Sequence, residues 1–351
     1  MPLDPFFAER LRVHRRYLVG KAVKDLRARV SALWNIERAQ PAAPGKEPAG
    51  SPGSRARAKH RRAALAWDRT ELETVGTPGP QLRISEHEVP VPGYPAVRVR
   101  VYHPPQADGP APACLTFFGG AFRIGGIDYP TTDAACRRRA ADAGIAMVAV
   151  DYALAPEHRF PTQVEQAHAA LEWLFAHAAD LGLDAGRIGV AGTSAGGNIA
   201  AALTLVNRDR GRLPLRLQVL EVPVLDLTGR HLELSATRAL GIPSLIALRE
   251  LRSVVRTYVP NRADARSAYA SPLLAASHAD LPPAVVFTAE YDPLRGDGAA
   301  YAAALRAAGV DASAVRYLGG THDTPIFTGA LPAARRWHAD VVTALRRLHD
   351  A

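Results

Sequence analysis

Residues 188–198 read IGVAGTSAGGN, where an apolar run changes abruptly into a turn of small residues. The turn, Gly192-Thr193-Ser194-Ala195-Gly196, is followed at once by the alanine-rich stretch NIAAALTLV. This pattern predicts a buried strand, a sharp turn and a helix, the setting in which a serine can act as a nucleophile. A serine that merely caps the helix would explain neither flanking glycine, because only small residues there let strand and helix approach without collision.

A nucleophilic serine needs a histidine base, and the sequence narrows the choice. In a strand–turn–helix enzyme of this kind the chain order is serine, acid, histidine. After the last expected strand only three histidines remain, and His338 and His349 fall within the C-terminal helical pattern. His322 instead lies in the loop YLGGTHD, directly after that strand. It is therefore the expected base.

The acid that orients this histidine is sought in AVVFTAEYDPLRGDG, residues 284–298. Asp292 ends the apolar strand and precedes Pro293, which places it on a rigid turn at the carboxyl edge of the sheet. Glu290 is expected to point to the other side of the strand, and Asp297 is expected to cap the next helix. Asp292 is therefore the expected acid.

Backbone amides for the developing oxyanion are expected in TFFGGAFRIGG, residues 116–126. This glycine-rich loop follows a buried strand, as such donors require. The loop matches neither GxGxxG nor the phosphate-binding P-loop, which argues against nucleotide binding.

Strand and helix patterns alternate along most of the chain. Two alternating segments separated by a Pro-Gly turn predict an antiparallel pair, and the later apolar runs predict mostly parallel, covered strands. The expected strands are residues 82–89, 96–104, 113–118, 146–152, 187–192, 217–224, 284–291 and 312–318; the expected helices are 131–142, 162–180, 195–208, 296–308 and 333–349. This is an α/β pattern with functional loops at the carboxyl ends of the strands.

Two further regions are expected to form a helical lid. Residues 1–75 read as a basic segment, with an amphipathic helical region over 5–38, a mobile loop near 40–60 and a short helix around 61–69. The catalytic domain is expected over 76–351. Within it, residues 226–283 are too long for one crossover and are expected to add a second lid portion, with a helix near 244–259.

Charge and composition restrict the class of protein. The net charge of +9 over 351 residues comes almost entirely from residues 1–75, which hold 16 basic and 8 acidic side chains. A solvated helix face is the expected reading, because no aromatic interleaving or nucleic-acid motif accompanies the charge, although an anionic partner or surface stays open. No apolar run reaches the roughly 18 to 20 residues of a membrane span, and the charged N-terminus predicts a cytoplasmic protein. Cys114 and Cys136 are expected to be buried, reduced thiols.

With these pieces placed, residues 80–350 resemble the hormone-sensitive-lipase family of α/β-hydrolases, bacterial carboxylesterases of the GTSAG type in particular. The motifs that carry the resemblance are FGGAF (118–122), DYALAPEHRFP (151–161), GTSAGGN (192–198), ASPLL (270–274), EYDPLRGDG (290–298) and GGTH (319–322). The resemblance implies an α/β-hydrolase fold with a mostly parallel eight-stranded sheet and a helical lid. It also implies a triad of Ser194, Asp292 and His322, and an oxyanion hole made by the amides of Gly120, Ala121 and Ala195.

The chain departs from the family pattern at two places. Phe118 and Ala121 stand where the family has histidine and glycine, and alanine disfavours a positive φ. Asp323 follows the expected base, where the family usually continues with glycine, and a carboxylate there is expected to raise the pKa of His322 or compete for its hydrogen bond.

The sequence thus predicts a serine carboxylesterase that hydrolyses small to medium acyl esters through an acyl-enzyme, with no metal or organic cofactor. Phe122 and Tyr129 are the expected substrate contacts. The expected partner is a small-molecule ester, with no nucleic acid and no stable membrane insertion, and the chain is compatible with a homodimer. Two alternatives stay open: a natural-product tailoring enzyme, acting as lactone hydrolase, acyltransferase or lyase, and a non-catalytic ligand receptor on the same scaffold.

Overall fold

The computed structural model describes residues 3–12, 52–105 and 109–350. The chain divides into two compact units, residues 1–58 and residues 59–351. In the first, residues 5–12 are helical. In the second, eight strands form one sheet in the order β1-β2-β4-β3-β5-β6-β7-β8. The strands are β1 (Ile84–Val91), β2 (Tyr94–Tyr102), β3 (Ala111–Phe117), β4 (Ala146–Asp151), β5 (Leu183–Thr193), β6 (Leu215–Glu221), β7 (Ala284–Ala289) and β8 (Ala312–Tyr317).

Strand direction follows the sequence patterns. β2 runs antiparallel to both β1 and β4, and every other neighbouring pair is parallel. All residues of β3 and β7 are buried, as expected for strands covered on both faces. β8 is different: it lies at the edge of the sheet, and its central residues are exposed.

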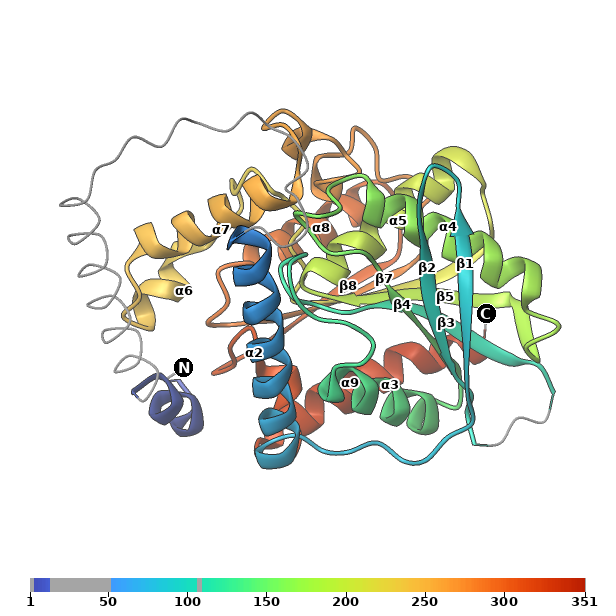
Figure 1. The fold of residues 1–351 in the computed structure, drawn as a ribbon, viewed down its shortest axis with the longest axis horizontal. Coiled ribbons are helices and arrows are strands. Elements are labelled where there is room, and N and C mark those ends of the chain that lie inside the picture. Colours follow the sequence, from blue (N-terminus) through green and yellow to red (C-terminus); the bar gives the residue numbers. More distant parts are fainter. Residues whose placement is uncertain (1–2, 13–51, 106–108, 351) are drawn as a thin grey trace. The chain divides into compact units, whose positions relative to one another are not determined.

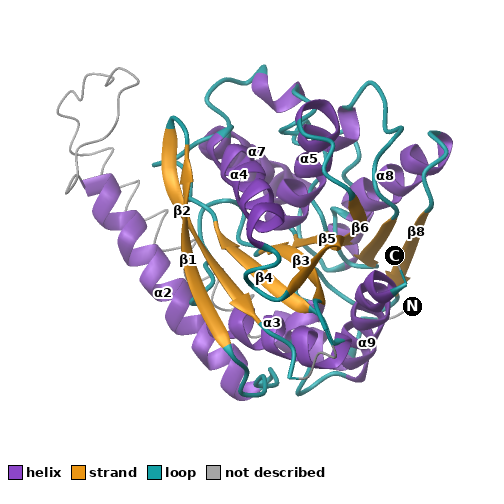
Figure 2. Ribbon diagram, turned by 90° about the vertical axis from the view of Figure 1, so that its right-hand side faces the viewer, coloured by secondary structure: helices purple, strands orange, loops and turns teal. Residues whose placement is uncertain are grey.

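Helices cover both faces of this sheet (Figures 1 and 2). α3 and α9 pack on one face, and α4, α5 and α8 pack on the other. The longer helices are α2 (Pro52–Thr74), α3 (Pro130–Ala143), α4 (Thr162–His177), α5 (Ala195–Arg210), α6 (Leu234–Ala239), α7 (Ser244–Tyr258), α8 (Arg295–Ala307) and α9 (Pro332–Arg346). Short 3-10 turns are η1 (Asp264–Arg266), η2 (Pro272–Leu274), η3 (Thr324–Ile326) and η4 (Arg347–His349). The sheet and its two helical layers enclose a large apolar core, and a smaller separate cluster consists of Val164, Ala202 and Val206 on α4 and α5.

The expected strands and core helices are all present, with ends shifted by a few residues. The expected loop near 40–60 is wrong from residue 52 onward, because α2 begins at Pro52. Proline is well tolerated at a first helical position, and the alanine, arginine and lysine residues that follow are good helix formers. Residues 13–51, which contain most of the expected amphipathic region and the rest of the loop, lie outside the described residues. In the described part of the chain, no helix is both long and apolar enough to cross a membrane.

Candidate active site

Ser194 lies on a strained turn between β5 and α5. Its φ of 55° and ψ of −113° are unfavourable for a residue with a side chain, and tight packing holds them in place. A Cβ atom at Gly192 would lie 2.1 Å from the carbonyl oxygen of Gly196, and one at Gly196 would lie 2.1 Å from the carbonyl oxygen of Phe117. The two glycines are therefore required by the close approach of strand, helix and neighbouring loop.

Three polar side chains from separate segments meet at this turn. His322 Nε2 lies 3.0 Å from Ser194 Oγ, and His322 Nδ1 lies 2.8 Å from Asp292 Oδ2. Asp292 follows β7 and is buried, and its other oxygen accepts the amide of Leu294 at 2.9 Å. Such a line can carry a proton from the hydroxyl to the imidazole while the carboxylate stabilises the resulting charge.

The other acids near Asp292 have different partners. Glu290 accepts the amide of Gly319 at 2.6 Å. Asp297 does not cap α8, so that expectation is wrong; it lies within the first turn of the helix and is fully buried. Its carboxylate accepts the amides of Leu225 and Asp226 at 2.7 and 2.9 Å, and so holds the loop after β6.

The protonation of His322 is set by opposing effects. Burial lowers its pKa, but Asp292 and then Asp323 more than offset this and raise the pKa to about 9. Asp323 acts through its charge, since no hydrogen bond joins it to His322 among the described contacts. The expected influence of Asp323 on the pKa is confirmed in its direction.

The loop after β3 turns sharply beside Ser194. Gly120, Ala121 and Phe122 have φ angles of 135°, 53° and 61°, all in the region that glycine tolerates best. The carbonyl of Gly120 accepts the amides of Arg123 and Ile124, which closes the turn. In the described part of the chain the amides of Gly120, Ala121 and Ala195 donate to no protein acceptor, so they are available as oxyanion donors.

Phe118 has an aromatic partner in place of the hydrogen bonds that a histidine would make. Its ring stacks on Tyr152, with centroids 4.1 Å apart and planes 9° from parallel. The hydroxyl of Tyr152 donates to the carbonyl of Phe118 at 2.8 Å. Stacking and this hydrogen bond together fix the start of the loop.

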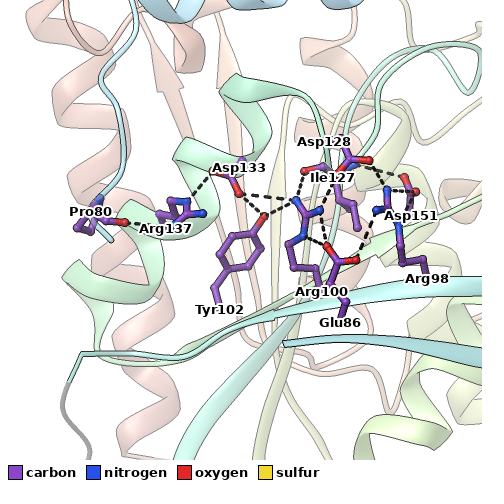
Figure 3. A network of polar contacts seen from close by, with 10 residues as sticks. All are labelled: Pro80, Glu86, Arg98, Arg100, Tyr102, Ile127, Asp128, Asp133, Arg137 and Asp151. Carbon is purple, nitrogen blue, oxygen red and sulfur yellow. Dashed lines mark hydrogen bonds and ion pairs between the residues drawn. The ribbon is translucent and has the colours of Figure 1, made fainter. Parts of the chain in front are cut away.

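An ion-pair network holds the far end of the same loop (Figure 3). Arg100 on β2 donates to the carbonyl of Ile127 at 2.9 Å and to Asp128 at 2.6 Å. Arg98 bridges Asp128 and Asp151, the last residue of β4. The segment between the glycine loop and α3 is thereby tied to two strands.

A third support comes from α2. The guanidinium of Arg61 donates to the carbonyls of Arg123 and Ala155 at 2.9 and 3.1 Å, and pairs with Glu157 at 2.6 Å. The outer turn of the glycine loop and the DYALAPE segment are thus joined through one side chain. The sequence did not distinguish Arg61 from the other basic residues of this segment, because α2 contains many arginines.

Glu221 is a buried residue of the site that the sequence did not single out. It ends β6, its side chain is 1% exposed, and its backbone carbonyl accepts the amide of Ser194 at 2.8 Å. Its carboxylate binds Arg139 at 2.8 Å and Trp337 Nε1 at 2.8 Å. Its position as the last residue of the apolar run LQVLE was the one sequence feature that could have indicated a buried glutamate. Its partners Arg139 and Trp337 are distant in sequence, so they could not be predicted from it.

A cavity of about 410 Å³ lies beside Ser194 and His322. Its walls come from α2, α3, the glycine loop and the segment after His322. Tyr129 lines it, as expected for a substrate contact, and its hydroxyl donates to the carbonyl of Arg61 at 3.4 Å. Phe122 does not line it: the ring is fully buried and stacks on Tyr258, with centroids 3.6 Å apart. The expectation of a substrate contact at Phe122 is therefore wrong for this cavity.

Metal binding has no evident site in the described part of the chain. Among residues 3–12, 52–105 and 109–350, no group of three or more His, Cys, Asp or Glu side chains is arranged to hold an ion. Cys114 and Cys136 are both buried and free, and burial raises the pKa of Cys136 to about 12. That of Cys114 is raised for the same reason.

Comparisons with known proteins show the family of the chain. The sequence pattern of a family with the alpha/beta hydrolase fold matches residues 114–326. The carboxylesterase NlhH of Mycobacterium tuberculosis is 37% identical over 285 residues, which cover 80% of this chain and 88% of that protein. An ethyl acetate hydrolase of Pseudomonas putida is 36% identical over 71% of this chain and 78% of its own length. The crystal structure of EstE1, a thermophilic carboxylesterase from a metagenomic library, matches with a TM-score of 0.75 and 36% identity, over 83% of this chain and 97% of that one. The chain belongs to the hormone-sensitive-lipase-like family of bacterial carboxylesterases, which have the α/β-hydrolase fold.

Proposed function

We propose that this esterase works through an acyl-enzyme formed on Ser194, with His322 as the base and Asp292 as the residue that orients it. The observation that carries the proposal is the continuous hydrogen-bonded line from Ser194 Oγ through His322 to Asp292, at the edge of a cavity. The family supports an ester as the substrate.

The steps follow from the positions of these groups. Ser194 Oγ attacks the ester carbonyl while His322 Nε2 takes the hydroxyl proton, and the new oxyanion is stabilised by the amides of Gly120, Ala121 and Ala195. The C–O bond to the alcohol then breaks as His322 returns the proton to the leaving oxygen. Water attacks the acyl-enzyme by the same route in reverse, which releases the acid and restores Ser194.

The cavity supports small to medium acyl esters as substrates. A volume of about 410 Å³ is near the lower end of typical ligand pockets, which span roughly 300–1,000 Å³. Trp67, Leu72 and Ile326 are among its apolar lining residues. We infer that acyl chains of medium length fill this space and that longer chains exceed it.

We propose further that α2, α6 and α7 form the lid over this site. Arg61 of α2 contacts the turn after the glycine loop, and Arg123 of that turn pairs with Glu250 of α7. Tyr258, the last residue of α7, stacks on Phe122. These contacts would couple lid position to the shape of the oxyanion loop.

The decisive experiment measures hydrolysis of p-nitrophenyl esters from acetyl to dodecanoyl by the wild type and by Ser194→Ala. The variant should lose at least about 10⁴-fold in kcat, since the nucleophile is absent. A fluorophosphonate should label the wild type at Ser194 and leave the variant unlabelled. Retention of most of the rate in a folded Ser194→Ala protein would overturn the proposal, and a label on another residue would also do so.

We also propose that the enzyme acts in the cytoplasm on a free small-molecule ester rather than on nucleic acid. A homodimer is the assembly we propose, because β8 is an edge strand on which Val315 is 36% exposed and the following Leu318 is 56% exposed. Sedimentation of the purified protein tests the assembly: a monomer across a micromolar concentration series would exclude it.

A further inference from the structure

Helix α3 lines the cavity over most of its length. Thr131 and Thr132 lie in its first turn, and Arg138 and Arg139 lie two turns further along, yet all four border the same space as Ser194. Arg138 comes seven positions after Thr131 in the helix, which corresponds to roughly 10 Å along the axis. The cavity is therefore elongated along α3, with two arginine residues in its walls.

These two arginines differ in their partners. Arg139 is neutralised by Glu221, whose carboxylate lies 2.8 Å from it. Arg138 donates to the backbone carbonyl of Thr77, which is a neutral acceptor. In residues 3–12, 52–105 and 109–350 no carboxylate lies within ion-pairing distance of Arg138, and its Nε is buried without a hydrogen-bond partner.

Among the described residues, Asp68 and Asp323 are the acidic side chains that line the cavity, and Asp142 lies on α3. Asp68 lines the cavity, but both its oxygens accept hydrogen bonds from Thr131. Thr131 lies in the first turn of α3, two turns before Arg138. Asp323 lies beside His322. Asp142, one turn beyond Arg138, is exposed and pairs with His338 at 2.7 Å. None of these carboxylates forms an ion pair with Arg138, although the charge of Asp142 acts on it from a distance.

An uncompensated cation in a cavity wall is costly. Burial, and then the neighbouring Arg139, lower the pKa of Arg138 to about 10, and the charge of Asp142 opposes this only in part, but the side chain stays charged at neutral pH. Carboxylates form strong, directional pairs with guanidinium groups, and such a pair is worth more in a water-poor cavity than in bulk solvent. An anionic group on the bound ester would supply the missing counterion.

We propose that Arg138 makes this enzyme selective for esters that carry a carboxylate at the end remote from the scissile bond. The proposal rests on the esterase function proposed above and narrows its substrate class to half-esters of dicarboxylic acids or esters of hydroxy acids. The elongated shape of the cavity suits a substrate with the ester at Ser194 and the carboxylate at Arg138, joined by an apolar chain.

The test compares pairs of substrates that differ only in charge. Monoethyl esters of dicarboxylic acids of about four to twelve carbons, a series whose extended lengths bracket the roughly 10 Å along α3, are each matched with the neutral terminal amide of the same length. Ethanol release gives kcat/KM for both members of a pair. At the best chain length we expect the acid to exceed the amide by at least about tenfold. Acetate esters of ω-hydroxy acids, paired in the same way, tell whether the carboxylate belongs to the acyl or the alcohol side.

Two variants and a control assign any preference to Arg138. In Arg138→Met the acid-to-amide ratio should fall to about one, mainly through KM, whereas Arg138→Lys should keep part of it because it keeps the charge. Arg137→Met is the matched control: Arg137 is the preceding residue of α3 and pairs with Asp133 (Figure 3). It does not line the cavity. Its ratio should equal that of the wild type.

The outcomes separate this inference from the function on which it rests. If neutral esters are hydrolysed but the acids show no advantage at any length on either side, the role of Arg138 is refuted and the esterase stands. A preference for the acids that persists in Arg138→Met also refutes the role of Arg138. The same holds if Arg138→Met and Arg138→Lys both lose activity while the acid-to-amide ratio stays unchanged, because that result would indicate a structural role through Thr77. If neither neutral nor anionic esters depend on Ser194, the proposed function itself fails.

Discussion

Tyr152 holds Phe118 in two ways at once, by stacking on its ring and by donating its hydroxyl to its carbonyl at 2.8 Å. The position of Phe118 determines where the following glycine loop begins, and that loop presents the amides of Gly120 and Ala121. We therefore expect the hydroxyl of Tyr152, which is buried, to position the proposed oxyanion donors.

Tyr152→Phe should keep the stacked ring and remove only this hydrogen bond. We expect kcat for a p-nitrophenyl ester to fall by about tenfold. Complete loss of one oxyanion donor typically lowers kcat by about 10²- to 10³-fold, and a displaced donor should lower it by less. The free energy of unfolding should fall by only about 1–2 kcal/mol. Tyr301→Phe is the matched control, because Tyr301 is equally buried and bonds Gln218 away from the loop. Equal kinetic effects in the two variants would contradict the positioning role.

The raised pKa of His322 predicts an alkaline activity profile. The base works only when neutral, so kcat/KM should rise with pH until it passes the pKa of about 9, instead of levelling off above the ordinary value near 6.5. Asp323→Asn removes one of the negative charges that raise this pKa, and should move the acidic limb to lower pH and increase the rate at pH 7. The measurement is kcat/KM from pH 5 to 10.

Asp311→Asn serves as the control for this profile, because Asp311 is an exposed carboxylate paired with Arg347. Its acidic limb should coincide with that of the wild type. An acidic limb near 6.5 in the wild type that Asp323→Asn does not move would refute the electrostatic assignment.

Ala121 stores backbone strain in the oxyanion loop. Its φ of 53° is costly for alanine and nearly free for glycine, so Ala121→Gly should raise the free energy of unfolding by about 1 kcal/mol. Glycine also loosens the loop, and we expect kcat to fall. Arg212→Gly relieves a similar φ of 50° on the surface away from the site, so it should raise stability without changing kcat. A more stable Ala121→Gly with a raised kcat would show that strain there opposes catalysis.

The sequence sufficed to predict that Ser194, Asp292 and His322 would meet, because each lies in the segment that follows a strand of one largely parallel sheet. The carboxyl ends of such strands share an edge, so chain order and strand ends together restrict the choice of residues. The same logic located the glycine loop, because it follows β3 next to β5.

Side-chain direction within that loop could not be predicted in the same way. Successive positive φ angles at Ala121 and Phe122 turn the Phe122 ring away from the cavity and onto Tyr258, a residue of the distant helix α7. Likewise, the pairing of Glu221 with Arg139 brings a residue of α3 to the end of β6, and no local pattern encodes this tertiary contact. Local propensity also misled at the start of α2, where proline and glycine suggested a loop but the helix begins.

Glu221 shows how much the region beneath Ser194 depends on a single buried charge. Glu221→Gln leaves Arg139 and Arg138 side by side without a neutralising carboxylate, and should lower the free energy of unfolding by about 3–5 kcal/mol. Adding Arg139→Met removes one of these cations, so the double variant should recover much of the loss. Denaturant unfolding of the wild type, both single variants and the double variant measures the coupling. If the two substitutions simply add, Glu221 acts through Trp337 and Thr193 rather than as the counterion of Arg139.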